Sequence, residues 1–155
     1  MISIIQMIKV LKNMDNANSG CPFCKQERSL LIKDGKLVYA QLSNPRLVDG
    51  HLLVIPKRHV ERLSDLTEEE RKEFLDMTAD LQDKILGRFS SGCDVRQNCR
   101  PFLPQSKLKV DHLHIHLLPR EFEDELYKRS MVFETEMFKD LTDEEKVRFV
   151  KLFGL

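Results

Sequence analysis

Residues 112–117 alternate histidine with an aliphatic side chain, and no other feature of the sequence restricts the fold as strongly. The stretch Asp111–Leu118 reads Asp-His-Leu-His-Ile-His-Leu-Leu. A period of two is typical of a β-strand, in which successive side chains point to opposite faces. We therefore expect a strand over 111–118 that carries three imidazoles on one face, each about 7 Å from the next. Its aliphatic side chains are expected to point into a core on the other face.

Three aligned imidazoles favour a chemical role over a plain solvated surface. Lys, Glu or Thr would serve equally well on a solvated face, whereas groups that titrate at a pKa of about 6.5 suit metal binding or proton transfer. Two interpretations stay open from these residues alone. One is a face that binds a metal, and the other is a site for nucleophilic or acid–base catalysis.

The pattern along the rest of the chain predicts an α+β fold on an antiparallel sheet, with one long helix and a C-terminal helix. β-prone runs at 30–33 and 36–39 flank Asp34-Gly35, which predicts a hairpin closed by a type I′ turn. Further strands are predicted over 50–56 and 93–98.

Two capping boxes predict where the helices begin. Thr67 and Glu70 open the long helix, and Gly87 stands where a C-terminal cap belongs. Thr142 and Glu145 open a second helix, which is expected to extend through residue 153. The apolar stripe of the long helix consists of Phe74, Leu75, Thr78, Leu81 and Ile85.

Length and charge exclude several classes of protein. The 155 residues fit one domain, and the 25 basic and 25 acidic side chains give no net charge, which disfavours a nucleic-acid-binding coat. No apolar run approaches the ~18 residues of a membrane span, and residues 1–12 lack the features of a signal peptide. We expect a cytoplasmic protein in which residues 1–20 form an extension and linker and residues 21–155 form a single domain.

The four cysteines are too few for a disulfide framework in a chain of this length. Cys21 and Cys24 form a C-x-x-C pair, whereas Cys93 and Cys99 follow no comparable spacing. The pair is open to three interpretations: two metal ligands, a redox dithiol, or two incidental core thiols. A redox pair would be expected at the start of a helix in a βαβ unit, and the sequence predicts no such unit there.

The histidine motif H-φ-H-φ-H-φ-φ, where φ is an apolar residue, resembles the signature of the histidine triad (HIT) family of nucleotide hydrolases and transferases. The segment Gly50–His59 is similar to that family's G-H-x-L-V-I-P-K-x-H. The segment Cys21–Cys24 is similar to the C-x-F-C of its zinc-containing bacterial members. Order and spacing hold from Cys21 to Arg120, so the resemblance implies a HIT-like fold.

The resemblance also implies a reaction. His114 would attack the α-phosphorus of a dinucleoside polyphosphate or a nucleotide phosphoramidate and form a nucleotidyl-histidine intermediate, which then releases a nucleoside monophosphate. His51 and His116 would contact the phosphate oxygens, where a donor stabilises developing charge. Relatives are often homodimers, so the resemblance implies a homodimer here as well.

A structural zinc ion is implied by the same resemblance. The ligands would be Cys21, Cys24, His59 and His112, a Cys₂His₂ set suited to closed tetrahedral coordination. Zinc in small sites of this kind supplies folding free energy on the order of 10 kcal/mol.

The sequence departs from the family pattern just before the triad. Relatives carry Gly-Gln-Ser-Val there, whereas this chain has Pro104-Gln105-Ser106 followed by five residues before His112. The resemblance implies that Asn98, Gln105 and Ser106 bind substrate, and Lys107 in the same loop is expected to join them. Asn98 is equally consistent with a turn residue at the end of a strand. Lys107 and Lys109, together with Arg96 and Arg100, form either a solvated surface or a positive rim that attracts polyphosphate.

Three other functions are weighed against the hydrolase. A non-catalytic, zinc-stabilised nucleotide-binding protein would use the same pocket without turnover. Processing of nucleic-acid ends is disfavoured by the balanced charge and by the lack of an appended C₂H₂ finger. A phosphorylase of the uridylyltransferase-like branches would carry glutamine in place of His116.

Overall fold

The computed structural model describes residues 20–154, so the expectations for residues 1–19 lie outside the described residues. The chain divides into two units, one ending at Phe122 and the other beginning at Glu123, and each is described by itself. The assignment of residues 21–155 to a single domain stays a prediction.

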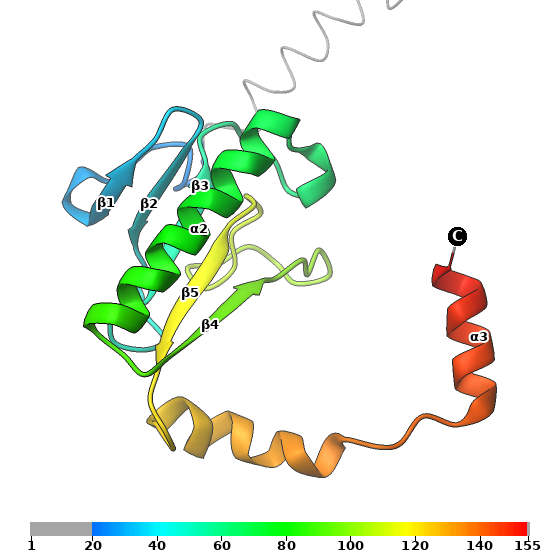
Figure 1. Ribbon diagram of the computed structural model, residues 1–155. Coiled ribbons are helices and arrows are strands. Elements are labelled where there is room, and N and C mark those ends of the chain that lie inside the picture. The colour runs from blue at the N-terminus through cyan, green and yellow to red at the C-terminus, as the bar shows by residue number, and fades with distance from the viewer. Residues whose placement is uncertain (1–19, 155) are drawn as a thin grey trace, which may run out of the picture. The chain divides into compact units, whose positions relative to one another are not determined.

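The first unit contains a five-stranded antiparallel sheet, which confirms the predicted α+β class (Figure 1). Its strands are β1 (Leu31–Asp34), β2 (Val38–Leu42), β3 (Leu52–Pro56), β4 (Gly92–Gln97) and β5 (Ile115–Arg120). In space their order is β1-β2-β3-β5-β4, so that β5 lies between β3 and β4. Short 3₁₀ turns occupy Arg28–Leu30 and Leu63–Asp65.

The hairpin between β1 and β2 is present, but its turn differs from the predicted one. Asp34 pairs with Tyr39, and the Gly35 amide donates to the Val38 carbonyl, so the turn is longer than the predicted two residues. Gly35 does not adopt the positive φ that a type I′ turn needs, since Gly50 is the one glycine at positive φ within residues 20–154. The Glu73 carboxylate of the long helix shapes this turn by accepting hydrogen bonds from the Leu37 and Val38 amides.

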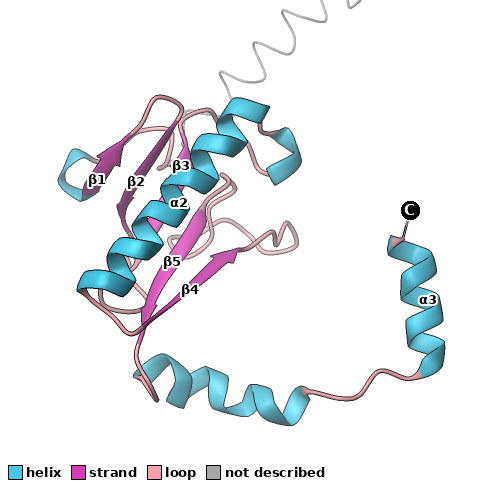
Figure 2. Cartoon of the chain, in the orientation of Figure 1, coloured by secondary structure: helices cyan, strands magenta, loops and turns pink. Residues whose placement is uncertain are grey.

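The long helix α2 (Glu68–Arg88) lies across one face of the sheet (Figures 1 and 2). It begins at the predicted capping box, in which the Glu70 amide donates to Thr67 Oγ1 over 3.2 Å. Two details of the prediction were wrong. Gly87 lies inside the last turn because the helix continues to Arg88, and the Leu75 side chain is exposed because it falls outside the stripe that faces the sheet.

The two faces of the sheet bury different sets of side chains, as a period of two requires. The cluster between α2 and the sheet includes Val38, Ala40, Leu52, Val54, Phe74, Met77, Leu81, Ile85, Leu113, Ile115 and Leu117. The aliphatic members of the histidine motif are therefore core residues, as predicted. The opposite face carries Tyr39, Leu53 and Ile55, against which Phe23 packs.

An ion pair between a buried acid and a partly exposed base joins the start of α2 to the chain that follows β3. The Arg58 guanidinium donates to both carboxylate oxygens of Glu70, over 2.9 and 2.7 Å, and Glu70 is also the acid of the capping box. Glu70 is only 5% exposed, and its bonds to Arg58 hold its pKa below the usual range. The pair fixes the backbone one residue before His59.

We expect Glu70→Ala to lower the free energy of unfolding by about 2 kcal/mol, because it removes the cap and the charged hydrogen bonds together. Urea unfolding measures the change. Glu69→Ala is the matched control: Glu69 is an exposed acid in the same turn, and its loss should change stability by less than about 0.5 kcal/mol. Equal effects of the two substitutions would show that the ion pair contributes nothing specific.

The second unit consists of helical segments. A π-helical turn spans Tyr127–Met131, a 3₁₀ segment spans Val132–Met137, and α3 spans Asp143–Phe153. The predicted capping box at Thr142 and Glu145 is confirmed. Phe149 and Phe153 stack within α3, with ring centroids 5.8 Å apart.

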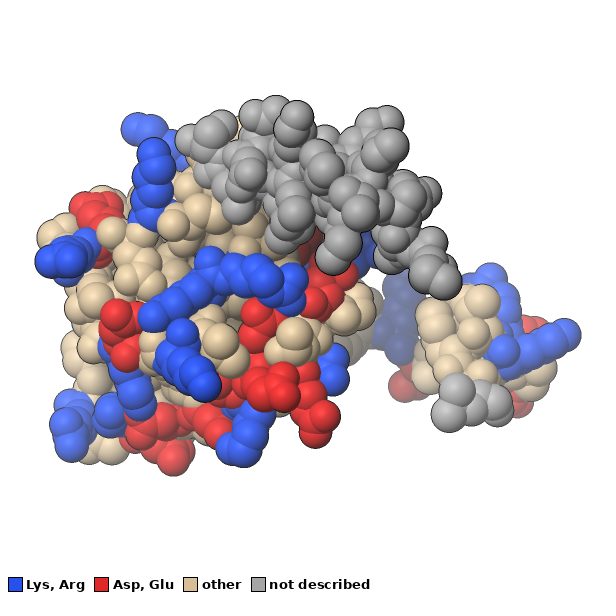
Figure 3. Space-filling view, turned by 90° about the horizontal axis from the view of Figure 1, so that it is seen from above, with Lys and Arg blue, Asp and Glu red and all other residues tan. Residues whose placement is uncertain are grey.

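Charge of both signs is present on the face of the molecule in Figure 3. On the face shown in Figure 3, Lys and Arg side chains are interspersed with Asp and Glu side chains, as the equal totals of 25 suggest.

None of the helices within residues 20–154 is long and apolar enough to cross a membrane.

Candidate active site and metal centre

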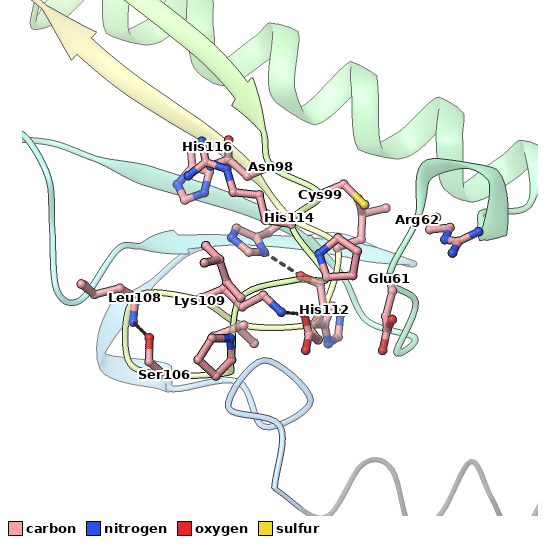
Figure 4. Close-up of a pocket in the computed structure, with 17 residues that line it drawn as sticks. Glu61, Arg62, Asn98, Cys99, Ser106, Leu108, Lys109, His112, His114 and His116 are labelled. Atoms are coloured by element: carbon pink, nitrogen blue, oxygen red, sulfur yellow. Dashed lines mark hydrogen bonds and ion pairs between the residues drawn. The ribbon is translucent and has the colours of Figure 1, made fainter. Parts of the chain in front are cut away.

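A cavity of about 430 Å³ lies beside the histidine motif, a volume suited to a small-molecule ligand. Figure 4 shows that His112, His114 and His116 contribute to it together with the loop that precedes them. The strand is shorter than predicted, since β5 begins at Ile115 and only His116 of the three lies in it. The chain before it is held instead by the Leu113 amide, which donates to the Val60 carbonyl over 2.6 Å.

The hydrogen bond of His114 determines which of its nitrogens can react. Its Nδ1 lies 2.6 Å from the carbonyl oxygen of His112, so Nδ1 carries the proton and donates it to that oxygen (Figure 4). Burial lowers the pKa of His114, although this hydrogen bond opposes the shift, so the ring is neutral at physiological pH. A neutral ring protonated at Nδ1 has its lone pair at Nε2, which leaves Nε2 as the nucleophilic nitrogen.

His51 and His116 form a hydrogen-bonded pair whose direction is fixed by the backbone. The Leu47 amide donates to His51 Nδ1 over 3.1 Å, so the proton of His51 is on Nε2. His51 Nε2 lies 2.9 Å from His116 Nδ1 and donates to it, which places the proton of His116 on Nε2. His116 is thereby a hydrogen-bond donor at the cavity, whereas His51 lies behind it and outside the residues that line the cavity.

Burial keeps both rings of this pair neutral. It lowers the pKa of His51 to about 4 and that of His116 to about 3, and the charges of neighbouring groups lower them further in the same direction. Each folded-state pKa lies below the usual value of 6.5. Between pH 6.5 and 4 the unfolded chain therefore binds protons that the folded chain does not.

We expect stability to fall as pH decreases from 6.5 towards 4, because proton uptake in that window favours the unfolded chain. Urea unfolding at a series of pH values between 7 and 5 measures the slope. A His51→Gln/His116→Gln variant removes both titrating rings and should show a shallower slope. Identical slopes for the two proteins would contradict the assignment of neutral rings.

Four potential metal ligands converge at His112, the one of them that lines the cavity. Cys21, Cys24, His59 and His112 each offer one ligand atom, and these atoms lie within 4.8 Å of one another. Cys21 Sγ lies 3.3 Å from His112 Nδ1, and Cys24 Sγ lies 3.3 Å from His59 Nδ1. Tetrahedral zinc with the usual bond lengths would separate a sulfur and a nitrogen ligand by about 3.6 Å. The four residues therefore fit a tetrahedral ion.

The surroundings of this cluster orient its ligands. His112 Nε2 donates to the Pro56 carbonyl over 2.8 Å, which leaves Nδ1 unprotonated and directed at the thiols. Burial, the hydrogen bond with Cys21 and the charge of Cys21 raise the pKa of the Cys24 thiol to about 11. A bound divalent cation reverses such a shift, since a coordinated thiol is deprotonated.

Phe23, between the two cysteines, connects the metal cluster to the nucleophile. Its ring packs edge-on against His114, with centroids 5.1 Å apart, and its carbonyl accepts a hydrogen bond from the Tyr39 hydroxyl over 2.7 Å. The sequence gives no direct signal for this contact, because a phenylalanine inside a C-x-x-C pair is equally consistent with core packing.

The predicted substrate-binding residues divide into two groups. Asn98 and Ser106 line the cavity, whereas Gln105 and Lys107 lie outside its lining. Gln105 accepts a 3.5 Å hydrogen bond from the Asp111 amide, and the Lys107 side chain is exposed. The structure also places three basic side chains at the cavity: Arg62, Arg100 and Lys109.

Comparison with known proteins agrees with this geometry. Residues 25–123, more than half of the chain, match the family description "HIT domain". The chain belongs to the HIT domain family. The match begins just after Cys24, so both cysteines of the metal cluster lie outside it, whereas all five histidines lie inside it.

Two relatives of this HIT chain carry different enzyme names. It is 35% identical over 104 residues to an AP-4-A phosphorylase of Mycobacterium tuberculosis, covering 64% of this chain and 50% of that protein. It is 30% identical over 111 residues to an adenosine 5'-monophosphoramidase of Saccharomyces cerevisiae, covering 68% of this chain and 66% of that protein. The chain thus spans about half of the first of these relatives and two-thirds of the second.

Solved structures confirm the fold. A hypothetical protein from Leishmania major superposes with a TM-score of 0.64 at 22% identity, covering 87% of this chain and 94% of that one. At this identity the likeness concerns the HIT fold alone.

Proposed function

We propose that this HIT chain is a nucleotide hydrolase or transferase in which His114 Nε2 attacks the α-phosphorus of a bound nucleotide. The observation that carries the proposal is the bond from His114 Nδ1 to the His112 carbonyl, which leaves Nε2 as the nitrogen with a lone pair. Imidazole is a suitable nucleophile because it attacks when neutral and departs readily from phosphorus afterwards.

The reaction has two steps. In the first, a bond forms from Nε2 to the α-phosphorus while the bond from that phosphorus to the leaving group breaks, and the leaving group takes the electron pair. In the second, water attacks the same phosphorus, the bond to Nε2 breaks, and a nucleoside monophosphate is released as the water loses a proton. His116 Nε2–H donates to a phosphate oxygen and stabilises the charge that develops there.

His51 acts through His116 and is a positioning residue in this scheme. His51 Nε2–H donates to His116 Nδ1, and this hydrogen bond keeps the donating Nε2–H of His116 in place. This differs from the role that the sequence resemblance implied, in which His51 itself contacted the phosphate.

The names of the relatives support both proposed substrate classes. One is named for AP-4-A and the other for an adenosine 5'-monophosphoramidate. The cavity of about 430 Å³ lined by His114 and His116 offers room for one nucleotide at the nucleophile.

We further propose that the ion held by Cys21, Cys24, His59 and His112 is zinc with a structural role. A closed Cys₂His₂ set supplies folding free energy and leaves no open coordination position for substrate. The cluster would also fix the backbone of His112, whose carbonyl orients His114. A homodimer, as the family resemblance implies, and a cytoplasmic location, as the sequence predicts, complete the proposal.

Release of AMP from diadenosine tetraphosphate and from adenosine phosphoramidate tests the function. The folded, zinc-loaded chain should release AMP from at least one of them. Binding of both compounds without release would favour the non-catalytic nucleotide-binding protein instead. Added phosphate tests whether water or phosphate accepts the nucleotidyl group, because attack by phosphate in the second step yields ADP in place of AMP. The phosphorylase name of one relative suggests phosphate as an acceptor.

A further inference from the structure

We propose that Lys109 is a specificity-determining residue that selects substrates whose leaving group is a polyphosphate anion over those whose leaving group is an amine. The inference rests on the proposed function and deepens it, since it assigns the leaving-group side of the cavity to one side chain.

A tight turn delivers Lys109 to the cavity. The Ser106 amide donates to the Lys109 carbonyl over 2.9 Å and the Lys109 amide to the Ser106 carbonyl over 3.3 Å, forming a small bridge. The Leu108 amide donates to Ser106 Oγ over 3.1 Å (Figure 4). As a result Lys109 lines the cavity with His114, whereas Lys107 in the same turn does not.

The Lys109 side chain is nearly buried, which is unusual for lysine. Only 16% of it is exposed, and its ammonium group makes an ion pair with Asp111 Oδ1. Lysine has three N–H donors, so the bond to Asp111 leaves two. Asp111 thereby holds the ammonium group in place without using all of its donors.

The charge around Lys109 favours an anion. The ionised side chains that line the cavity are Arg62, Arg100 and Lys109 against Glu61 and Asp111, an excess of one positive charge.

The leaving groups of the two substrate classes need different stabilisation as the bond to the α-phosphorus breaks. When a polyphosphate leaves, the P–O bond breaks, the electron pair passes to the bridging oxygen, and the leaving group departs as an anion that a nearby cation stabilises. When an amine leaves, the P–N bond breaks, the electron pair passes to the nitrogen, and a proton from the solvent converts it to neutral ammonia, which needs no cation beside it. A fixed cation such as Lys109 therefore aids the first reaction selectively.

Two substitutions at Lys109 test the proposal. Lys109→Gln keeps the length and polarity of the side chain but removes the charge, and Lys109→Arg keeps the charge. We expect Lys109→Gln to lower kcat/KM for diadenosine tetraphosphate about ten-fold, the effect of one charged hydrogen bond. Turnover of adenosine phosphoramidate should change less than about two-fold, and Lys109→Arg should retain most of the activity on the tetraphosphate.

Lys107→Gln distinguishes one placed ammonium group from the general charge of the loop. We expect it to leave the ratio of the two activities unchanged, because Lys107 lies outside the cavity lining. An equal loss in Lys107→Gln and Lys109→Gln would overturn the proposal. A loss of both activities to the same extent in Lys109→Gln would also overturn it, because that result indicates a general binding or structural role.

Calorimetric binding separates failure of this inference from failure of the proposed function. The wild-type chain should bind ATP more tightly than AMP, and Lys109→Gln should reduce that difference about ten-fold. A wild-type chain that turns over neither substrate would overturn the proposed function. The Lys109 assignment would then be decided by these affinities, and an unchanged ATP-to-AMP ratio in Lys109→Gln would overturn it.

Discussion

Replacement of His114 by alanine is expected to lower the rate of AMP release from diadenosine tetraphosphate by at least about 10⁴-fold. The substitution removes the one imidazole that the structure holds with its Nδ1–H on a backbone carbonyl and its lone pair at Nε2. Without that nitrogen no covalent intermediate can form. Single-turnover measurements with both proposed substrates give the rates.

Two controls show whether the loss is chemical. His114→Ala should bind ATP with an affinity close to that of the wild type, because the basic side chains at the cavity remain. Free imidazole added to His114→Ala should restore part of the rate, because it supplies the missing nucleophile in the space that the ring vacates. A variant that retains wild-type turnover would contradict the assignment of His114.

Loss of the metal is the second large effect that we expect. Cys24→Ser should bind less than one zinc ion per chain and should unfold at a temperature lower by roughly 10 °C or more, corresponding to several kcal/mol. The reason is that the cluster joins residues 21–24 to the chain after β3 and to the start of the histidine motif. Metal analysis and thermal unfolding provide the two measurements.

Cys99→Ser serves as the matched control for this variant. Cys99 is an exposed free thiol outside the metal cluster, so the variant should retain one zinc ion and the wild-type melting temperature. Activity should fall together with zinc content in Cys24→Ser, since His112 contributes both a ligand atom and the carbonyl that orients His114. Full stability in zinc-free Cys24→Ser would show that the cluster has no structural role.

Sequence periodicity was sufficient to predict the core residues of the histidine motif but not the length of its strand. The alternation over 112–117 predicts which residues are buried, and Leu113, Ile115 and Leu117 all lie in the core. It does not reveal where pairing begins, because that depends on partner strands. Only Ile115 and later residues have partners in β3 and β4, and the backbone before them bonds to Val60 instead.

Side chains in the loop before the triad were harder to assign. The sequence favoured Lys107 as a substrate contact, and the structure places Lys109 at the cavity instead. The difference comes from the bridge between Ser106 and Lys109, because this bridge reverses the direction of the chain. No local residue preference predicts it. The hairpin turn at Gly35 differs from the predicted type for a similar reason. Its amides donate to Glu73 of α2, a helix that is distant in sequence.

The metal cluster shows what spacing alone can and cannot predict. Cys21 and Cys24 are separated from His112 by about ninety residues of chain. Only the resemblance to known sequences predicted that they bind the same ion. The structure brings the four ligand atoms within 4.8 Å of one another. The bond from His112 to the Pro56 carbonyl, which selects the ligating nitrogen, depends on tertiary packing.

The most direct test of the central claim is to look for the covalent bond at His114. Wild-type protein mixed with diadenosine tetraphosphate is quenched within the first turnover in alkaline denaturant, which preserves a phosphorus–nitrogen bond, and its peptides are weighed by mass spectrometry. The account predicts an adenylyl group on the peptide that contains His114, and none in His114→Ala. Rapid turnover by the wild type with no adduct at any quench time would contradict it.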